Sequence, residues 1–455
     1  MSGRLIESLA TTPALAALFS DESVLQVMLD FETALARAEA RHGLIPMEAA
    51  DAIAAAARPD KLDISVLAEA AFRAGTPTIP LVKMLTDLVR KTDAEAVRFV
   101  HWGATSQDVA DTAMSLLLKR AEPILIADML RLEKALADVS ERHKQSVMLG
   151  RTLLQPATPV TFGLKAAGWL ASVCRGRRRL QKAFRVAVVL QFGGASGTLA
   201  SLGDRGIHVA ETLSADLGFG DAPAAPWHTQ RDQLATLICA CGVLTGSLGK
   251  MARDISLLMQ SEVGEAFEPG AEGRGGSSTM PNKRNPTACS LTLAAAHRVP
   301  GLVASFLSAM LQEHERGVGG WQAEWPIIAA AVQSTGVAIA SMAEVAEGLS
   351  VDAQKMRLNL ENTNGAIFAE RAMMLLGAKL GRDVAHKVVE AAVRKSVKEG
   401  RNLAAVLAET PEVAAHLGSA ELKELETPEE YLGSAEAFRK ALASESSRQD
   451  EDKEQ

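Results

Sequence analysis

The chain has 455 residues, of which 47% are hydrophobic and only 4% aromatic. This composition, rich in Ala and Leu, favours helices that pack closely through small side chains, and the length suits two or three domains. The net charge of −7 is modest for this size, and no face is obviously basic. A nucleic-acid-binding protein is therefore excluded on electrostatic grounds.

The cysteines predict a reducing compartment and no metal site. They lie within apolar helical patterns, and none has a His or a further Cys at metal-ligand spacing: Cys174, Cys239, Cys241 and Cys289. The N-terminus lacks the features of a signal peptide, and no uninterrupted apolar run reaches the length of about 20 residues that spans a membrane. We expect a cytoplasmic protein with no membrane or nucleic-acid partner and, because no nucleotide-binding loop is seen either, no metal or organic cofactor.

The first part of the chain predicts a small helical domain over residues 1–110. Val24, Met28, Phe31 and Leu35 step by helical spacing along one apolar face. Further helices are predicted at 49–57, 64–74 and 80–89, separated by Pro and Gly. At the end of this domain, Thr105 or Ser106 can cap a helix whose first turn carries Asp108. On these residues alone, ordinary capping and a role in a site are equally supported.

Residues 111–350 change to long apolar stripes and predict a central bundle of helices. The stripe from Leu234 to Leu258 averages the spacing of supercoiled helices. The other long helices are predicted at 114–140, 157–190, 287–313 and 325–349. Several are apolar on all sides, which suits self-association better than a monomer. Residues 351–443 predict a C-terminal helical domain and 444–455 a charged, disordered tail, so the fold class is all-α.

The loop from Gly264 to Pro286 carries the strongest chemical signal. Its glycines predict a mobile polar segment, and Asn285 with Pro286 predicts a helix start, with Asn as the capping residue. Between them lie Ser277, Ser278 and Lys283. Hydroxyls and a cation near a helix N-terminus can hold a carboxylate and stabilise an oxyanion.

Residues 276–286, GSSTMPNKRNP, resemble the GSSxMPxKxNP active-site loop of the fumarase/aspartase superfamily. Residues 99–113 resemble its first signature region. The resemblance implies three helical domains with a central long-helix bundle, and a homotetramer whose active sites each take residues from three chains. It also implies that His101, Thr105 and Ser106 lie at the site, with the hydroxyls binding a substrate carboxylate.

By the same resemblance, Ser277 is the catalytic acid/base and Ser278 a neighbouring oxyanion donor. A serine hydroxyl is a poor acid or base at neutral pH, so its oxyanion needs the backbone amides, the following helix start and Lys283.

The second signature region departs from the superfamily pattern. Residues 150–159 resemble GRTHxQxAxP, but Leu153 stands at the position of the His. In the superfamily that His is assigned to acid/base chemistry, including protonation of poor leaving groups. A carboxylate, whose acid has a pKa of about 4, leaves without a proton. Loss of the His is thus tolerable where the bond joins carbon to a carboxylate oxygen, which is lactone chemistry.

Three further segments, 191–200, 226–232 and 312–325, resemble the bacterial 3-carboxy-cis,cis-muconate cycloisomerases, and they extend the resemblance over residues 15–380. It implies lactonisation of 3-carboxy-cis,cis-muconate in the protocatechuate branch of the β-ketoadipate pathway of aromatic catabolism. Such a tricarboxylate needs several cationic or donor partners, and the candidates are Arg151, Lys283, Asn285, Thr105, Ser106 and Arg316.

Several alternatives stay open at the level of sequence. A cycloisomerase for 3-sulfomuconate has a substrate of similar charge and shape, and Asn282, where close relatives often have His, leaves the substrate preference open. An elimination lyase of the adenylosuccinate lyase type is opposed by Leu153. A non-enzymatic scaffold is opposed by the intact serine loop. For His228 and His314, a structural hydrogen bond and a site role are equally supported.

Overall fold

The computed structural model describes residues 5–270, 275–276, 280 and 283–444. The chain divides into two compact units. The first comprises Met1–Leu130, Arg175–Gly249 and Leu291–Ser341, and the second comprises Arg131–Cys174, Lys250–Ser290 and Met342–Gln455. The predicted domain boundaries near 110 and 350 fall at the start of a long helix and at a short strand, and the three-domain division stays a prediction.

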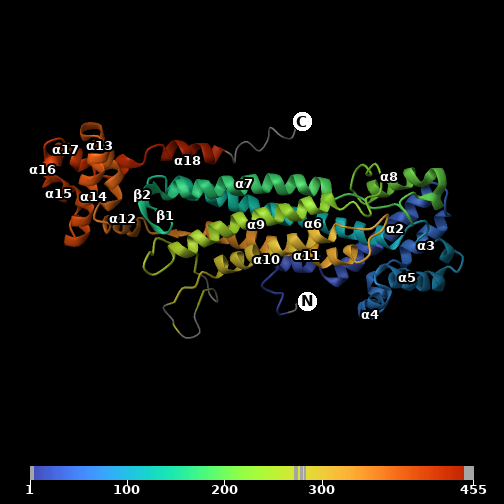
Figure 1. The fold of residues 1–455 in the computed structure, drawn as a ribbon. Helices are drawn as coiled ribbons and strands as arrows, with labels where there is room; N and C mark the ends of the chain where they lie inside the picture. The colour runs from blue at the N-terminus through green and yellow to red at the C-terminus, as the bar shows by residue number, and fades with distance from the viewer. Residues whose placement is uncertain (1–4, 271–274, 277–279, 281–282, 445–455) are drawn as a thin grey trace. The chain divides into compact units, whose positions relative to one another are not determined.

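Long helices dominate the chain and confirm the all-α prediction. Figure 1 labels them α6 (Ser106–Arg142), α7 (Phe162–Ala187), α9 (Asp232–Leu258), α10 (Thr287–Ala309) and α11 (Gly320–Glu347). Glycines let their backbones approach closely: a Cβ at Gly176 of α7 would lie 2.8 Å from the Leu244 side chain of α9, and one at Gly249 of α9 would lie 2.6 Å from Ala296 of α10. Larger side chains at these points would push the helices apart.

The first unit adds a cluster of shorter helices. They are α1 (Pro13–Leu18), α2 (Asp21–Arg41), α3 (Met47–Ala56), α4 (Ile64–Ala74), α5 (Thr78–Thr92), α8 (Gly206–Asp216) and the 3₁₀ turns Pro59–Lys61, Ala96–Phe99 and Ala200–Arg205. Helix α2 packs against α3 and α8, and its N-terminus is capped by the Ser20 hydroxyl. Phe31, Leu85 and Leu213 are fully buried in the shared apolar core, so α2 is a rigid element of this unit.

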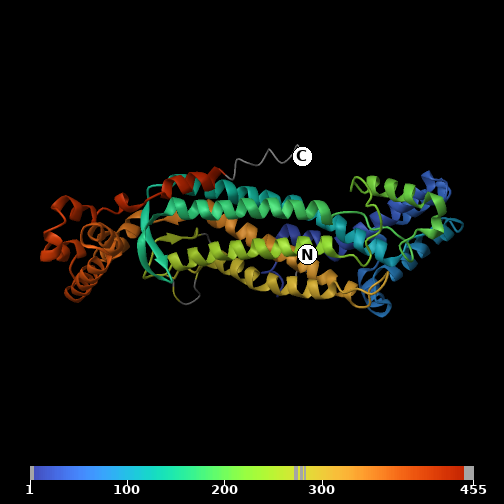
Figure 2. The same ribbon diagram turned by 45° about the horizontal axis from the view of Figure 1, so that its top comes forward.

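The second unit contains an antiparallel hairpin and the C-terminal helices. The hairpin pairs β1 (Val147–Thr152) with β2 (Gln155–Thr161), and β1 lies beside α12 (Ala353–Glu361) (Figure 1, Figure 2). The remaining elements are β3 (Ala266–Phe267), β4 (Ser350–Val351), α13 (Ala369–Leu380), α14 (Arg382–Glu399), α15 (Leu403–Ala408), α16 (Pro411–Ala414), α17 (Ser419–Glu424), α18 (Ala435–Ala443) and the 3₁₀ turns Ala366–Phe368 and Pro428–Tyr431. Val147 and Leu149 of β1 share a core with Phe368 and Leu376.

The hairpin corrects the predicted helix at 157–190, which begins only at Phe162. Pro156 and Pro159 lie in β2, where they donate no backbone hydrogen bond and oppose a helix. Leu153 and Leu154 form the two-residue turn with φ of 50° and 65°. Such a turn is usually occupied by Asn and Gly, because side chains rarely tolerate positive φ. The structure thus places two strained leucines at an exposed tip.

Helices α9, α10 and α11 are long and apolar enough to cross a membrane by length and composition alone. The most apolar window is 61% buried in α9 and 67% buried in α11, but only 22% buried in α10. Packing inside the protein therefore accounts for much of the apolar surface of α9 and α11. Most of the apolar window of α10 is exposed in the single chain.

Candidate active site

The first signature region forms a loop that Asp108 holds in place. Asp108 lies in the first turn of α6 and is fully buried. Its carboxylate accepts hydrogen bonds from Thr105 N at 3.0 Å and from His228 Nε2 at 2.8 Å. It also accepts from the backbone amides of Gly193 and Gly194 and from Gln191 Nε2. A single carboxylate thereby joins the segment before α6, the 191–194 segment and His228.

His101 lies two residues before Gly103 in this loop and adopts a left-handed backbone, with φ of 58°. Its Nδ1 is 2.7 Å from Oε1 of Glu32, a buried residue of α2. Burial acts to lower the pKa of His101, but the charge and hydrogen bond of Glu32, together with the charge of Asp108, outweigh burial and raise that pKa. The loop therefore presents an imidazole that is more basic than an ordinary histidine.

Arg316 reaches the same region from the segment between α10 and α11. Its guanidinium donates to Gln107 Oε1 at 2.9 Å and to the carbonyl oxygens of Gly194 and Ala195. These acceptors are neutral, so they hold the guanidinium without cancelling its charge. A Cβ at Gly194 would lie 2.8 Å from the Gly103 carbonyl oxygen, so the 191–194 segment contacts the His101 loop directly.

The structure thus brings four predicted residues into one region of the first unit: His101, Thr105, Ser106 and Arg316. Thr105 and Ser106 are half-buried at the start of α6, and the Ser106 carbonyl oxygen accepts from Thr78 Oγ1 at 3.1 Å. A guanidinium, an imidazole of raised pKa, two hydroxyls and the positive end of a long helix suit a carboxylate of a small substrate.

A buried ionic network centred on Arg231 lies next to this region. Arg231 is 2% exposed and donates to both Asp111 and Glu324, at 2.6–3.1 Å. Burial acts to lower the pKa of Arg231, but the two carboxylates raise it overall. Trp321 Nε1 donates to Asp111, and Gln107 Nε2 donates to both Asp111 and the His228 carbonyl oxygen. Gln107 therefore links the network to Arg316.

The second unit holds Arg151, Lys283 and Asn285. Arg151 of β1 makes a two-point ion pair with Glu265, at 2.9 and 2.5 Å, and Glu265 also accepts from Asn359 Nδ2. Burial lowers the pKa of Lys165, whose surroundings include Arg151 and Glu265. Because Glu265 already neutralises Arg151, the arginine offers N–H donors to a ligand but little net charge.

The start of α10 differs from its predicted capping. The buried Glu268 carboxylate accepts from the Ala288 and Cys289 amides, at 3.2 and 3.1 Å, where Asn285 was expected to do so. Asn285 instead donates through Nδ2 to the Gly276 carbonyl oxygen at 3.3 Å. A longer side chain arriving from a distant loop thus replaces the local cap.

Lys283 and Asn285 line a cavity of about 190 Å³ together with Glu268. Ser277, Ser278 and Asn282 lie outside the described residues. Arg151, Lys283 and Asn285 all belong to the second unit, so the predicted residues fall into two separate groups.

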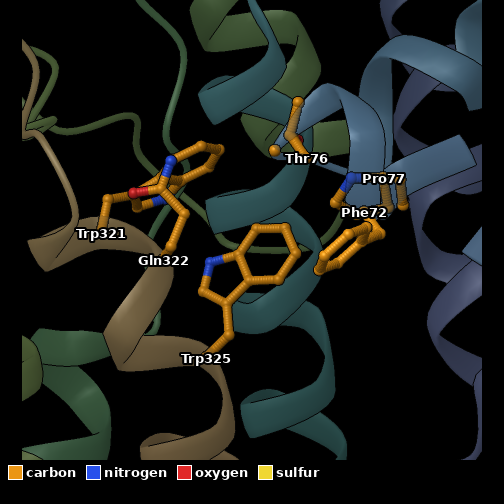
Figure 3. Close-up of a pocket in the computed structure, with 8 residues that line it drawn as sticks. Phe72, Thr76, Pro77, Trp321, Gln322 and Trp325 are labelled. Carbon is orange, nitrogen blue, oxygen red and sulfur yellow. The ribbon is translucent and has the colours of Figure 1, made fainter.

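An apolar cavity of about 280 Å³ in the first unit does not resemble a carboxylate site. Figure 3 shows Phe72, Thr76 and Pro77 on one side and Trp321, Gln322 and Trp325 on the other. Its lining residues carry no charge, so a tricarboxylate would be desolvated there without an opposing cation.

The structure distinguishes the two histidines that the sequence left undecided. His228 is 5% exposed and bonded to Asp108, whereas His314 is exposed and its backbone carbonyl accepts from Thr229 Oγ1. Sequence reasoning missed the roles of Glu32, Asp108 and Glu268. Only Asp108 left a local signal, because an acid three residues after a capping Thr is a capping pattern.

Comparison with known proteins identifies the family of the chain. Residues 7–301 match the family described as Lyase, and residues 365–442 match the adenylosuccinate lyase C-terminus. The chain is 48% identical over 434 residues to a 3-carboxy-cis,cis-muconate cycloisomerase of Bradyrhizobium diazoefficiens, covering 95% of this chain and 96% of that protein. It is also 48% identical over 443 residues to a cycloisomerase of the same name from Pseudomonas aeruginosa, covering 97% and 96% respectively.

The crystal structure of the 3-carboxy-cis,cis-muconate lactonizing enzyme from Pseudomonas putida superimposes with a TM-score of 0.91 at 45% identity, covering 98% of this chain and 99% of that one. Among the described residues, no group of three His, Cys, Asp or Glu side chains could hold a metal ion. The chain belongs to the Lyase family, within the fumarase/aspartase superfamily.

Proposed function

We propose that the chain is a cycloisomerase that converts 3-carboxy-cis,cis-muconate into a carboxymuconolactone. The observation that carries this proposal is its similarity, over almost the whole chain, to cycloisomerases named for that substrate. The matching structure of a lactonizing enzyme supports it.

Leu153 favours lactone chemistry over the elimination of a poor leaving group. It occupies the His position of the second signature region and is 97% exposed at the hairpin tip. A hydrocarbon side chain neither donates nor accepts a proton. A reaction whose carbon–oxygen bond ends on a carboxylate needs no protonation at that oxygen, because the carboxylate is stable as an anion.

The chemistry then consists of positioning, charge stabilisation and one proton transfer to carbon. A carboxylate of the substrate adds through oxygen to the conjugated double bond, and the displaced π electrons move into another carboxylate as an aci-carboxylate. One proton is delivered to carbon, so the trianionic substrate and one proton give a dianionic lactone. We assign the delivery to Ser277, oxyanion stabilisation to Ser278 and the electrostatic support of both to Lys283.

By the resemblance, both groups of residues belong to substrate-binding sites that different chains of the tetramer complete. His101, Thr105, Ser106 and Arg316 would hold one carboxylate in the first unit, since Arg316 is anchored by neutral acceptors and keeps its charge. Arg151 and Asn285 would add N–H donors from the second unit.

We infer a homotetramer in which three chains complete each active site. The support is the apolar helix α10, whose most hydrophobic window is only 22% buried within one chain. Contact with other copies would remove that surface from water and stabilise the assembly. We also propose a cytoplasmic enzyme without a metal or organic cofactor, because the sequence contains neither a metal-ligand cluster nor a nucleotide-binding loop.

The test is the ultraviolet absorbance of 3-carboxy-cis,cis-muconate after addition of purified enzyme, with and without a chelator. Rapid loss of the diene absorbance, insensitive to the chelator, is the expected result. A parallel reaction with 3-sulfomuconate measures which muconate the enzyme prefers. A reaction with adenylosuccinate tests for the elimination activity of a lyase. Turnover of adenylosuccinate alone would overturn the proposal.

A further inference from the structure

Helix α2 carries two buried carboxyl groups that the proposed chemistry does not use. Glu32 and Glu39 are seven residues apart, which places them about two turns apart on one helix face. They are 1% and 0% exposed. One oxygen of Glu32 bonds His101, whereas Glu32 Oε2 and both oxygens of Glu39 find no hydrogen-bond partner among the described residues. Unpaired buried carboxyl oxygens are costly, so this arrangement needs an explanation.

We propose that Glu32 is a positioning residue that holds His101 as an imidazolium, so that its Nε2–H binds a carboxylate of the substrate. The inference rests on the proposed function, because it assigns a role at the same site.

Geometry is the first support. The 2.7 Å separation between His101 Nδ1 and Glu32 Oε1 is typical of a charge-assisted hydrogen bond. The Glu32 contact fixes the plane of the ring, and the φ of 58° places His101 in a left-handed backbone conformation that is strained for a residue with a side chain. The hydrogen bond to Glu32 helps to stabilise this strained conformation.

The second support is that the other ring nitrogen has no hydrogen-bond partner. Among the described residues, none forms a hydrogen bond with His101 Nε2, and the His101 side chain is 16% exposed. With Nδ1 bound to Glu32, only Nε2 can reach a ligand. A neutral ring bonded in this way would present a lone pair at Nε2 and repel a carboxylate, whereas the imidazolium donates a hydrogen bond.

Charge is the third support. The charged groups that act on the His101 ring are Glu32 from α2 and Asp108 from α6, both carboxylates, and together they raise the pKa of His101 despite its burial. Glu39 behaves differently: burial, assisted by the charge of Glu32, raises its pKa to about 9. Near neutral pH, Glu39 is thus a protonated carboxyl, and of these two buried groups of α2 it is Glu32 whose charge acts on the His101 ring.

This difference provides a matched pair of variants, Glu32→Gln and Glu39→Gln. Both replace a buried carboxyl of α2 by an amide of the same shape, but only Glu32→Gln removes a charge at neutral pH. We expect Glu32→Gln to raise KM for 3-carboxy-cis,cis-muconate about tenfold or more at pH 8 and to change kcat much less. The KM of Glu39→Gln should stay within about twofold of wild type.

The pH dependence gives the signature that a purely structural role would not produce. Without the Glu32 charge, the pKa of His101 falls and the ring is neutral at pH 8, but it regains its proton at lower pH. The KM of Glu32→Gln should therefore approach the wild-type value as the pH falls toward 5.5. His101→Gln, which offers a neutral N–H donor, should raise KM at both pH values. An equal KM defect for Glu32→Gln at pH 5.5 and pH 8 would overturn the proposal.

A measurement without turnover separates this inference from the proposed function. In ¹⁵N-histidine-labelled enzyme, the His101 ring nitrogens should show imidazolium shifts in wild type and Glu39→Gln at pH 7.5, and neutral shifts in Glu32→Gln. A neutral His101 in the wild-type enzyme would overturn the inference even if the cycloisomerase is active and Glu32→Gln does not fold. An imidazolium in an enzyme that ignores every muconate would instead contradict the proposed function.

Discussion

The predicted site residues fall into two groups whose physical character differs. In the first unit, buried carboxylates fix His101 and the α6 start, and neutral acceptors fix Arg316, so binding groups are held before a ligand arrives. In the second unit, Lys283 and Asn285 lie beside a glycine-rich segment, and Arg151 is already paired with Glu265. The difference is consistent with the roles we propose: the first group would bind a carboxylate in a rigid site, and the second would supply the reacting groups and further N–H donors.

The largest expected effect separates chemistry from binding. Ser277→Ala removes the group assigned to proton transfer, and we expect kcat to fall by three to four orders of magnitude, or about 4–5 kcal/mol in activation free energy, with the fold intact. Ser290→Ala is the control, because Ser290 Oγ donates to the carbonyl oxygen of Pro286, the residue just before α10. Near-normal turnover of Ser277→Ala would move the proton transfer to another residue.

The next effect concerns the rigidity of the first group. Arg231→Met leaves Asp111 and Glu324 buried without their counter-charge, and we expect the free energy of unfolding to fall by about 3–5 kcal/mol, measured by urea denaturation. Arg73→Met is the control, since Arg73 pairs with Glu69 on the exposed surface and contributes little. A loss below about 1 kcal/mol for Arg231→Met would show that the network is not what makes this group rigid.

A third effect is the pH dependence of stability that the buried Glu39 of α2 should produce. The folded-state pKa of Glu39 is about 9 and the ordinary value is 4.5. The unfolded chain therefore releases this proton first, and stability declines as pH rises from about 4.5 to about 9. Glu39→Gln removes this dependence, so its stability relative to wild type should increase by about 2–3 kcal/mol between pH 5.5 and pH 8. Thermal or urea unfolding at both pH values measures it, and a constant difference would contradict the assignment.

The smallest effect concerns the hairpin of the second unit. Leu153→Asn combined with Leu154→Gly supplies residues that tolerate positive φ, and we expect the free energy of unfolding to rise by about 1 kcal/mol. We expect kcat/KM to fall, because the resemblance places this tip at the site. Val318→Asn, at another exposed apolar position, is the control. Unchanged kcat/KM in the double variant would show that the two leucines are not needed for turnover.

The sequence was sufficient to predict the all-α class and the long helices, because apolar residues spaced three and four apart lie on one face of a helix and this spacing is local in the chain. It was also sufficient for the family, because the serine-loop motif is continuous in the chain. The strands at 147–161 were missed, since Pro156 and Pro159 in β2 depend on pairing with β1, and the leucine turn lacks Asn or Gly. The Asn285 cap was expected because Asn–Pro is a local signal, whereas the carboxylate of Glu268 comes from outside the helix.

The sequence by itself determined which groups we propose for a small anionic substrate: two serines, a lysine, arginines and a histidine in signature segments. Only the tertiary structure decided how those groups are charged and held. Arg151 is neutralised by Glu265 and Arg316 is not, and His101 is bound by Glu32, which is 69 positions away in the chain. The physical reason is that hydrogen bonding, desolvation and Coulomb interaction depend on separation in space, which local patterns in a sequence do not specify.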